Sequence, residues 1–317
     1  MQYREFGKTG INVSVIGLGG HEFGEGGYIR GFGDDGKLAV QRGYVFDGFG
    51  QENRQQIVAK ALDLGINLFD LAIDSEKDAM GRQLKDLKPS EEILIQTRPE
   101  GMVYSYDPEN RQMAQYDLLK TEVQRICKMI GRDCVDILNV AFLKTAVDAD
   151  PDYMAKIGDN VSRLKEEGLI RFASADTFSG ERFLLSQLAS GHFDSTFISY
   201  NPTDQAMEDK IIPDAHERGI ALIARECFRK GQWFAIAEEA GLTDRAFVAH
   251  LGIKWCLRDD RIASVVLGVA SAEQLESNCE ILNSPGLSDE ESSALEKMLA
   301  TDFFKKELVG RTTSLKK

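Results

Sequence analysis

The sequence has no excess of positive charge, no long hydrophobic run and no regular pattern of cysteines. Its 317 residues carry a formal charge of −13, which disfavours nucleic acids and anionic membranes as partners, because both require a basic surface. No apolar run approaches the roughly 18 to 20 residues that span a bilayer, and residues 1–5 lack the pattern of a secretion signal. We therefore expect a cytoplasmic protein whose partner is a small molecule.

The cysteines are odd in number and show no CxxC spacing, so neither a disulfide framework nor a thiolate metal site is expected. Buried, reduced thiols are the simpler interpretation. The five residues are Cys127, Cys134, Cys227, Cys256 and Cys279.

The composition, 43% hydrophobic and 28% charged, supplies enough apolar material for a sizeable core. No linker rich in proline or serine and no low-complexity segment divides the chain. We expect one domain over residues 1–317, with a polar tail over 301–317 that is partly mobile.

Short apolar runs alternate with amphipathic helical patterns along most of the chain. Eight runs have the character of buried parallel strands, and eight such units predict a closed (β/α)8 TIM barrel. A glycine turn at residues 8–10 also predicts an N-terminal β-hairpin between residues 3–6 and 11–14. The expected barrel strands are 15–18, 68–71, 93–97, 135–140, 170–175, 195–199, 221–224 and 263–267.

Charged and polar residues follow the ends of the expected strands, where barrels of this type carry their sites. Both carboxylates and guanidinium groups occur there, which suits a polyhydroxylated or anionic ligand. The alternative to a ligand site is that these charged groups only pair with one another at a solvated rim. The residues are His21, Glu22, Asp70, Asp74, Arg98, Asp176, Asn201, Arg225 and Glu226.

Several segments, in order, resemble the aldo-keto reductases. Residues 65–76 read GINLFDLAIDSE, close to the family pattern GINxFDTAxxYG, and further matches are REFGKTG at 4–10, LKEEGLIR at 164–171 and LGVASAEQLESN at 267–278. The resemblance covers almost the whole chain. It implies a (β/α)8 barrel and, in ordinary members, carbonyl reduction with NADPH.

The resemblance fails at the residues that perform that reduction. The family uses a Tyr as general acid, an Asp and a Lys that lower its pKa, and a His that orients the substrate. These positions correspond here to Ser75, Asp70, Arg98 and Ala141. Serine is a much weaker acid than a phenol, and arginine binds a carboxylate or phosphate better than it acts as a point charge. The sequence therefore predicts a changed reaction, or none.

The implied cofactor positions also differ from the family. The Ser-Asn pair that holds the nicotinamide corresponds to Asp176-Thr177, the Gln of the next strand to Phe197, and the stacking aromatic residue to Arg225. The segment that grips the adenosine phosphate contains Gly268, Gln274 and Asn278 without a basic pair. The resemblance leaves NADP(H) binding open.

His21 is the expected replacement for the lost acid, because it follows the first barrel strand and histidine titrates near neutral pH. A histidine that only caps a loop is the alternative. We expect His21, Asp70, Arg98 and Ser75 in the catalytic site. The expected substrate-binding residues are Glu22, Asp74, Asp176, Asn201, Arg225, Glu226, Tyr28 and Tyr44.

The segment from 24 to 52 is far longer than an ordinary barrel connection and interleaves glycines with aromatic residues. We expect a loop that covers the barrel mouth as a lid, from which Tyr28, Arg30 or Tyr44 reaches the ligand. A subunit contact in a homo-oligomer is the alternative.

Three hypotheses follow for function. The first is an enzyme on this barrel that performs acid/base chemistry on a sugar-like or acidic small molecule. The second is an NADP(H)-dependent oxidoreductase with a replacement proton donor. The third is a binding or regulatory protein without catalytic activity. The charged strand ends favour an enzyme, because buried charges are costly to keep without a role.

Overall fold

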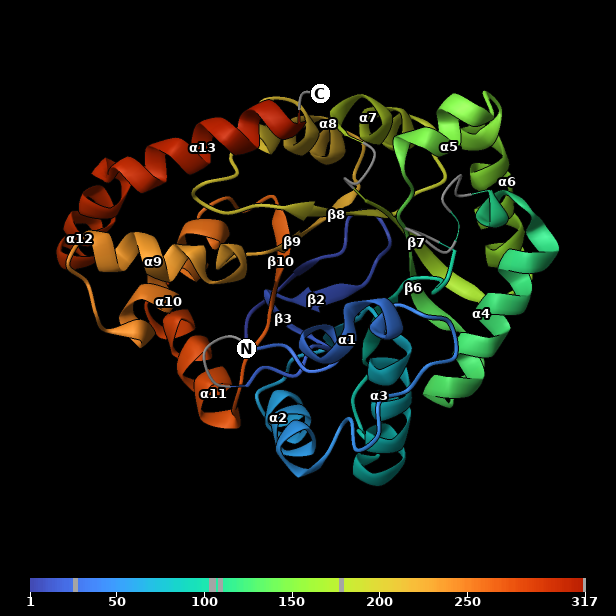
Figure 1. The fold of residues 1–317 in the computed structure, drawn as a ribbon, viewed down its shortest axis with the longest axis horizontal. Helices are drawn as coiled ribbons and strands as arrows, with labels where there is room; N and C mark the ends of the chain where they lie inside the picture. The colour runs from blue at the N-terminus through green and yellow to red at the C-terminus, as the bar shows by residue number, and fades with distance from the viewer. Residues whose placement is uncertain (25–27, 103–106, 108–110, 177–179, 316–317) are drawn as a thin grey trace.

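The computed structural model describes residues 1–317 except 25–27, 103–106, 108–110, 177–179 and 316–317. Eight parallel strands close into a barrel in the order β10-β3-β4-β5-β6-β7-β8-β9, and helices surround it (Figure 1). The strands are β3 (Ile16–Gly19), β4 (Leu68–Leu71), β5 (Leu94–Thr97), β6 (Val135–Val140), β7 (Ile170–Asp176), β8 (Ser195–Ser199), β9 (Ala221–Arg225) and β10 (Ile262–Leu267). This confirms the predicted TIM barrel, with strand bounds that shift by one residue at most.

The predicted hairpin is also confirmed, by β1 (Tyr3–Glu5) and β2 (Asn12–Ser14), which pair antiparallel. Phe6 and Val13 belong to the apolar cluster inside the barrel, together with Leu68, Leu94 and Ile137. The hairpin therefore supplies apolar side chains to the barrel interior.

The helices pack their apolar faces on the outside of the barrel, where a second and larger cluster of buried side chains lies. At least one helix connects each barrel strand to the next. In chain order they are α2 (Glu52–Asp63), α3 (Asp74–Leu87), α4 (Tyr116–Ile130), α5 (Lys144–Ala149), α6 (Tyr153–Glu166), α7 (Glu181–Ala189), α8 (Ile211–Glu217), α9 (Gln232–Glu239), α10 (Arg245–Leu257), α11 (Ala272–Glu280) and α12 (Asp289–Ala300).

The C-terminal segment differs from the expectation of a partly mobile polar tail. Residues Asp302–Leu315 form helix α13, which runs along the rim of the molecule in Figure 1. Phe304 is buried, and Arg311 Nε donates to Asp204 Oδ2 at 2.9 Å. The polar composition of the segment does not indicate these contacts, because they join residues that are distant in sequence.

Candidate active site

A polar layer lies inside the barrel above the apolar cluster. Because successive residues of a strand face opposite sides, the interior-facing Leu68, Leu94 and Ile137 are followed two positions later by Asp70, Gln96 and Asn139. Asp70 and Gln96 are paired on β4 and β5, whereas Asn139 on β6 lies two residues beyond Ile137, the residue that pairs with Gln96. The barrel thus changes from apolar to polar toward its C-terminal end.

His21, just after β3, forms a close pair with a carboxylate that the sequence analysis did not select. Its Nδ1 lies 2.5 Å from Oε1 of Glu76, in the first turn of α3, and the side chains are 34% and 1% exposed. The Ala72 N–H donates to the other oxygen, Oε2, at 2.6 Å. Glu76 thereby fixes the orientation of the imidazole, as the carboxylate of a catalytic triad does.

The pair shifts the pKa of both partners. Burial on its own would lower the pKa of His21, but the charge and hydrogen bond of Glu76 outweigh it and raise that pKa. Burial on its own would raise the pKa of Glu76, but His21 and the Ala72 N–H lower it overall. His21 is therefore held in its protonated form to a higher pH than a free histidine.

Glycine at position 20 makes this pair possible. A β-carbon there would stand only 2.4 Å from Oε2 of Glu76, so any other residue would displace the carboxylate. The sequence carried a signal for Glu76, since this residue occupies the glycine position that follows the tyrosine in the family pattern.

Asp70, at the inner face of β4, accepts a hydrogen bond from Gln96 Nε2 at 2.8 Å. Burial raises its pKa to about 6, against the opposing effects of Gln96 and of the charge of Arg98. A carboxyl group with such a pKa exchanges protons near neutral pH.

Replacement of Asp70 by asparagine is expected to stabilise the fold at pH 8. The shift from 3.8 to about 6 corresponds to about 3 kcal/mol of cost for the ionised form, as an upper bound. The gain should shrink as the pH falls through 6 toward 4, and it should vanish below the ordinary pKa of 3.8, where the group is protonated in both folded and unfolded chains. Urea unfolding at pH 4 and 8 measures the difference in stability between the wild type and the variant. Asp86→Asn is the control, because Asp86 is exposed. Equal stability of wild type and Asp70→Asn at pH 8 would contradict the burial effect.

Arg98, two residues beyond Gln96, brings positive charge to the same end of the barrel. Its charge acts on both Asp70 and His21, and its Nε lies 4.0 Å from Oε2 of Glu100. Burial raises the pKa of Glu100 despite the nearby Lys77 and Arg98. Ala141, at the histidine position of the family, is fully buried.

Asp176 and Arg225 form a two-pronged ion pair across the opposite side of the mouth. Arg225 Nη1 and Nη2 each donate to a different oxygen of Asp176 at 2.8 Å, and the guanidinium lies 4.8 Å from the centre of the Phe197 ring. Asn139 Nδ2 donates to Asp176 Oδ2 at 3.1 Å. These contacts place a salt bridge and a cation–π stack at the ends of β7, β8 and β9.

Three further predicted residues hold the segment after β3. The buried Ser75 Oγ accepts from the Phe46 N–H at 3.1 Å. Asp74 accepts from the Gly43 N–H at 2.6 Å, and Glu22 Oε1 accepts from the Gly50 N–H at 2.5 Å. Their side chains serve the architecture of this segment, so we do not include Ser75, Asp74 or Glu22 in the proposed catalytic group.

The same segment contains helix α1 (Phe32–Ala39) and packs on the start of α3 through a small apolar cluster that includes Ala39, Phe49 and Ile73. Arg30 donates to the Gly48 and Asp47 carbonyls at 2.6 Å each. The Phe32 ring lies 5.1 Å from the His21 ring, edge-on. The segment therefore meets the site at His21, and whether it opens as a lid or contacts a subunit stays a prediction.

The expected tyrosines of that segment make contacts within it. The Tyr28 hydroxyl donates to Asp34, and its side chain is 44% exposed. Tyr44 packs edge-on against Phe46, with ring centres 4.9 Å apart. In this conformation the contacts of both rings tie them to neighbours in the loop.

The remaining predicted residues line other parts of the strand ends. Asn201 is buried, its Nδ2 donates to the Glu226 carbonyl at 3.0 Å, and its Oδ1 accepts from Thr203. The Glu226 carboxylate lies 3.8 Å from Lys230 Nζ. Asn278 is buried in α11. Thr177 lies outside the described residues.

The expected adenosine-phosphate segment is already in contact with other parts of the protein. The Phe23 ring covers Gly268, where a β-carbon would lie 2.1 Å from Cε2. Gln274 Oε1 accepts from the Ala270 N–H at 2.9 Å, and the Ala270 carbonyl accepts from Asn53 at 2.9 Å.

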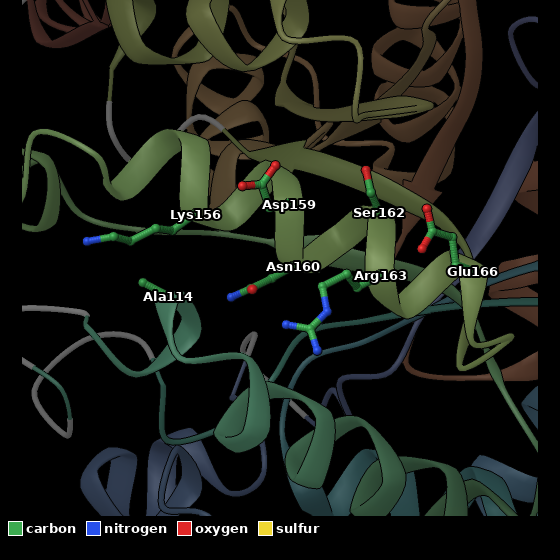
Figure 2. Close-up of a pocket in the computed structure, with 7 residues that line it drawn as sticks. All are labelled: Ala114, Lys156, Asp159, Asn160, Ser162, Arg163 and Glu166. Atoms are coloured by element: carbon green, nitrogen blue, oxygen red, sulfur yellow. The ribbon is translucent and has the colours of Figure 1, made fainter.

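A separate hollow of about 450 Å³ lies on the outside of the barrel. Figure 2 shows its lining, which comes mainly from α6 with Ala114 opposite. Arg163 stacks 3.4 Å over the Tyr116 ring, and Lys156 pairs with Asp150 at 2.6 Å. The basic groups of the hollow are thus engaged, and it shares no residue with the site at the strand ends.

The closed barrel of eight parallel strands places the chain in the class of (β/α)8 barrel proteins. Residues 36–300 match the model of the aldo/keto reductase family. The chain belongs to the aldo-keto reductase family. Among the described helices, none is long and apolar enough to cross a membrane.

Curated relatives are similar to the chain over nearly its whole length. L-galactose dehydrogenase of Arabidopsis thaliana is 23% identical, with 94% of each chain covered. L-glyceraldehyde 3-phosphate reductase of Escherichia coli is 22% identical, with 95% of this chain and 93% of the relative covered. Among solved structures, an aldo-keto reductase of Bacillus halodurans in its holo form has a TM-score of 0.68 at 20% identity, with coverage of 94% and 96%.

Proposed function

We propose that this chain is an enzyme that transfers protons, rather than hydride, on a polar or anionic hydroxycarbonyl compound of the sugar or hydroxy-acid type. The observation that carries the proposal is the pair of His21 and the buried Glu76, joined at 2.5 Å. It resembles the general base of other enzymes, in which a carboxylate orients an imidazole and stabilises its charged form.

The other groups supply what such a reaction requires. Nδ1 of His21 faces Glu76, so Nε2 on the far side of the ring is the nitrogen that meets the substrate. It would remove the proton from the carbon beside the carbonyl, while the electrons move to the carbonyl oxygen. Arg98 supplies positive charge for that oxygen or for an anionic group. Asp70, with a pKa of about 6, returns a proton to the adjacent carbon or to a leaving group.

The names of the relatives support the substrate class. L-galactose and L-glyceraldehyde 3-phosphate, named for two of them, are both aldehydes with a hydroxyl group on the adjacent carbon. Such compounds carry the acidic C–H that a general base removes. The relatives' reactions themselves do not pass to this chain, because their identity to it is 22–23%.

The described residues do not fit a nicotinamide in the position that the resemblance implies. Where the family stacks an aromatic ring on the nicotinamide, Arg225 pairs with Asp176 at 2.8 Å and lies over Phe197. Phe23 covers Gly268 in the segment implied for the adenosine phosphate. Family membership still favours an NADP(H)-dependent reductase with His21 as proton donor as the second candidate, which requires both contacts to open.

Incubation of the purified chain in D2O tests the proposal. With L-galactose or L-glyceraldehyde 3-phosphate and no nicotinamide, we expect NMR to show loss of the proton signal beside the carbonyl carbon. Oxidation of NADPH or NADH without such exchange would support the reductase instead. Binding of these compounds with neither reaction would support the non-catalytic alternative.

A further inference from the structure

Two buried amide oxygens at the polar layer lack a hydrogen-bond partner in the part of the chain that the structure describes. Gln96 and Asn139 are 0% and 4% exposed, and among the described residues neither Gln96 Oε1 nor Asn139 Oδ1 receives a hydrogen bond. Buried polar atoms in folded proteins are nearly always paired. Two unpaired acceptors on adjacent strands therefore indicate a donor that the described residues do not provide.

The neighbouring carboxylates fix which way each amide faces. Gln96 Nε2 donates to Asp70 Oδ1 on β4 at 2.8 Å, and Asn139 Nδ2 donates to Asp176 Oδ2 on β7 at 3.1 Å. In the barrel order β4-β5-β6-β7, the two nitrogens thus point away from each other. Each oxygen is consequently on the side of its amide that faces the other strand, and the two amides are at different levels, because Gln96 pairs with Ile137 and Asn139 lies two residues beyond it.

The partner must offer at least two hydrogen-bond donors, because one hydroxyl group carries a single proton. The positive charges of Arg98 and Arg225 are accompanied by the carboxylates of Asp70 and Asp176, which contact the two amides, so the surroundings favour a donor without charge of its own. Hydroxyl groups on different carbons of a polyol meet these conditions.

We infer that Gln96 and Asn139 form a hydroxyl-binding subsite that selects polyhydroxylated ligands. Two hydroxyl groups of the ligand donate to Gln96 Oε1 and Asn139 Oδ1, while the carboxylates of Asp70 and Asp176 hold the amides in place. The inference rests on the proposed function for where the substrate lies, and it adds the residues that recognise the hydroxyl groups. A site built to pair with hydroxyl groups rejects analogues that lack them.

Binding of two unreactive probes tests the subsite without any turnover. Galactitol and hexane-1,6-diol share a six-carbon chain and differ in the number of hydroxyl groups, and neither has a carbonyl group. By calorimetry or saturation-transfer NMR, we expect galactitol to bind the wild-type chain at least tenfold more tightly. Equal binding of the two probes, or no binding of galactitol, would overturn the subsite.

Variants then assign the effect to the two amides. Asn139→Leu and Gln96→Met should each weaken galactitol about tenfold and leave hexane-1,6-diol unchanged. Asn160→Leu is the matched control, since Asn160 is also a buried amide but donates to the Met113 carbonyl outside the barrel. Unchanged galactitol binding in both folded variants would overturn the inference. Because the wild-type comparison needs no variant, a variant that fails to fold leaves the test intact.

The outcome is separate from that of the proposed function. Galactitol selectivity without proton exchange in D2O would retain the subsite and remove the proposed reaction. Proton exchange without galactitol selectivity would retain the proposed reaction and remove the subsite.

Discussion

Replacement of His21 by alanine is expected to lower the rate of proton exchange by roughly a hundredfold or more, the usual contribution of a positioned general base. The reason is the geometry of the pair, in which the buried Glu76 holds Nδ1 at 2.5 Å and leaves Nε2 for the substrate. The exchange rate in D2O measures it. His216→Ala, on the exposed face of α8, is the matched control and should leave the rate unchanged.

The Glu76→Gln variant distinguishes a glutamate that positions His21 from one that only fills space. Glu76 raises the pKa of His21 through its charge and hydrogen bond, so removal of the charge should lower that pKa. A base acts when deprotonated, and the rise of the exchange rate with pH should therefore begin at lower pH in the variant, while the maximal rate falls. A purely structural glutamate would leave the pH profile in place, and full activity of His21→Ala would remove the proposed base.

The second large effect concerns stability, where Asp74→Ala is expected to cost about 3–5 kcal/mol of unfolding free energy. Asp74 lies 3.0 Å from Nζ of Lys77, both side chains are fully buried, and Arg125 approaches the carboxylate at 2.8 Å. Loss of Asp74 leaves the buried Lys77 without its nearest carboxylate. Urea or thermal unfolding near pH 7 measures the change.

The same helix offers a matched control for that measurement. Asp78 pairs with Arg82 at 3.0 Å, but both side chains are exposed, so Asp78→Ala should cost no more than about 0.5 kcal/mol. Burial raises the pKa of Asp74, yet Lys77 and Arg125 lower it overall. Its contribution is thus present above the ordinary aspartate pKa and is lost as the pH falls below about 4. Equal losses in the two variants would contradict the network.

The barrel was predictable because the same pattern of a strand followed by a helix recurs along the sequence. Eight apolar runs such as 135–140, with helical patterns between them, leave few arrangements open. Strand ends were equally readable, and they led directly to His21, Asp70 and Asp176. The helical C-terminal segment was not readable, since its anchor joins Arg311 to Asp204, 107 residues apart.

The partners within the site were harder to predict than its members. Glu76 contacts His21, and Gln96 contacts Asp70. No local sequence pattern indicates which residues the fold brings into contact. Ser75 is the reverse case, in which the motif indicates one role and the contacts indicate another. Its position in the family pattern suggested chemistry, but its hydroxyl group binds the Phe46 backbone, 29 residues earlier in the chain. A motif indicates where a residue lies in the fold, while the contacts of its side chain indicate what that side chain does.

The C-terminal helix also bears on how the protein is made. Arg311 pairs with Asp204, and Glu307 pairs with Arg229 just after β9 at 2.9 Å. During synthesis these residues leave the ribosome after all eight barrel strands, so the loops after β8 and β9 gain these anchors only after the strands have emerged. The barrel strands can associate before that moment, whereas this side of the mouth is completed only when α13 has joined it.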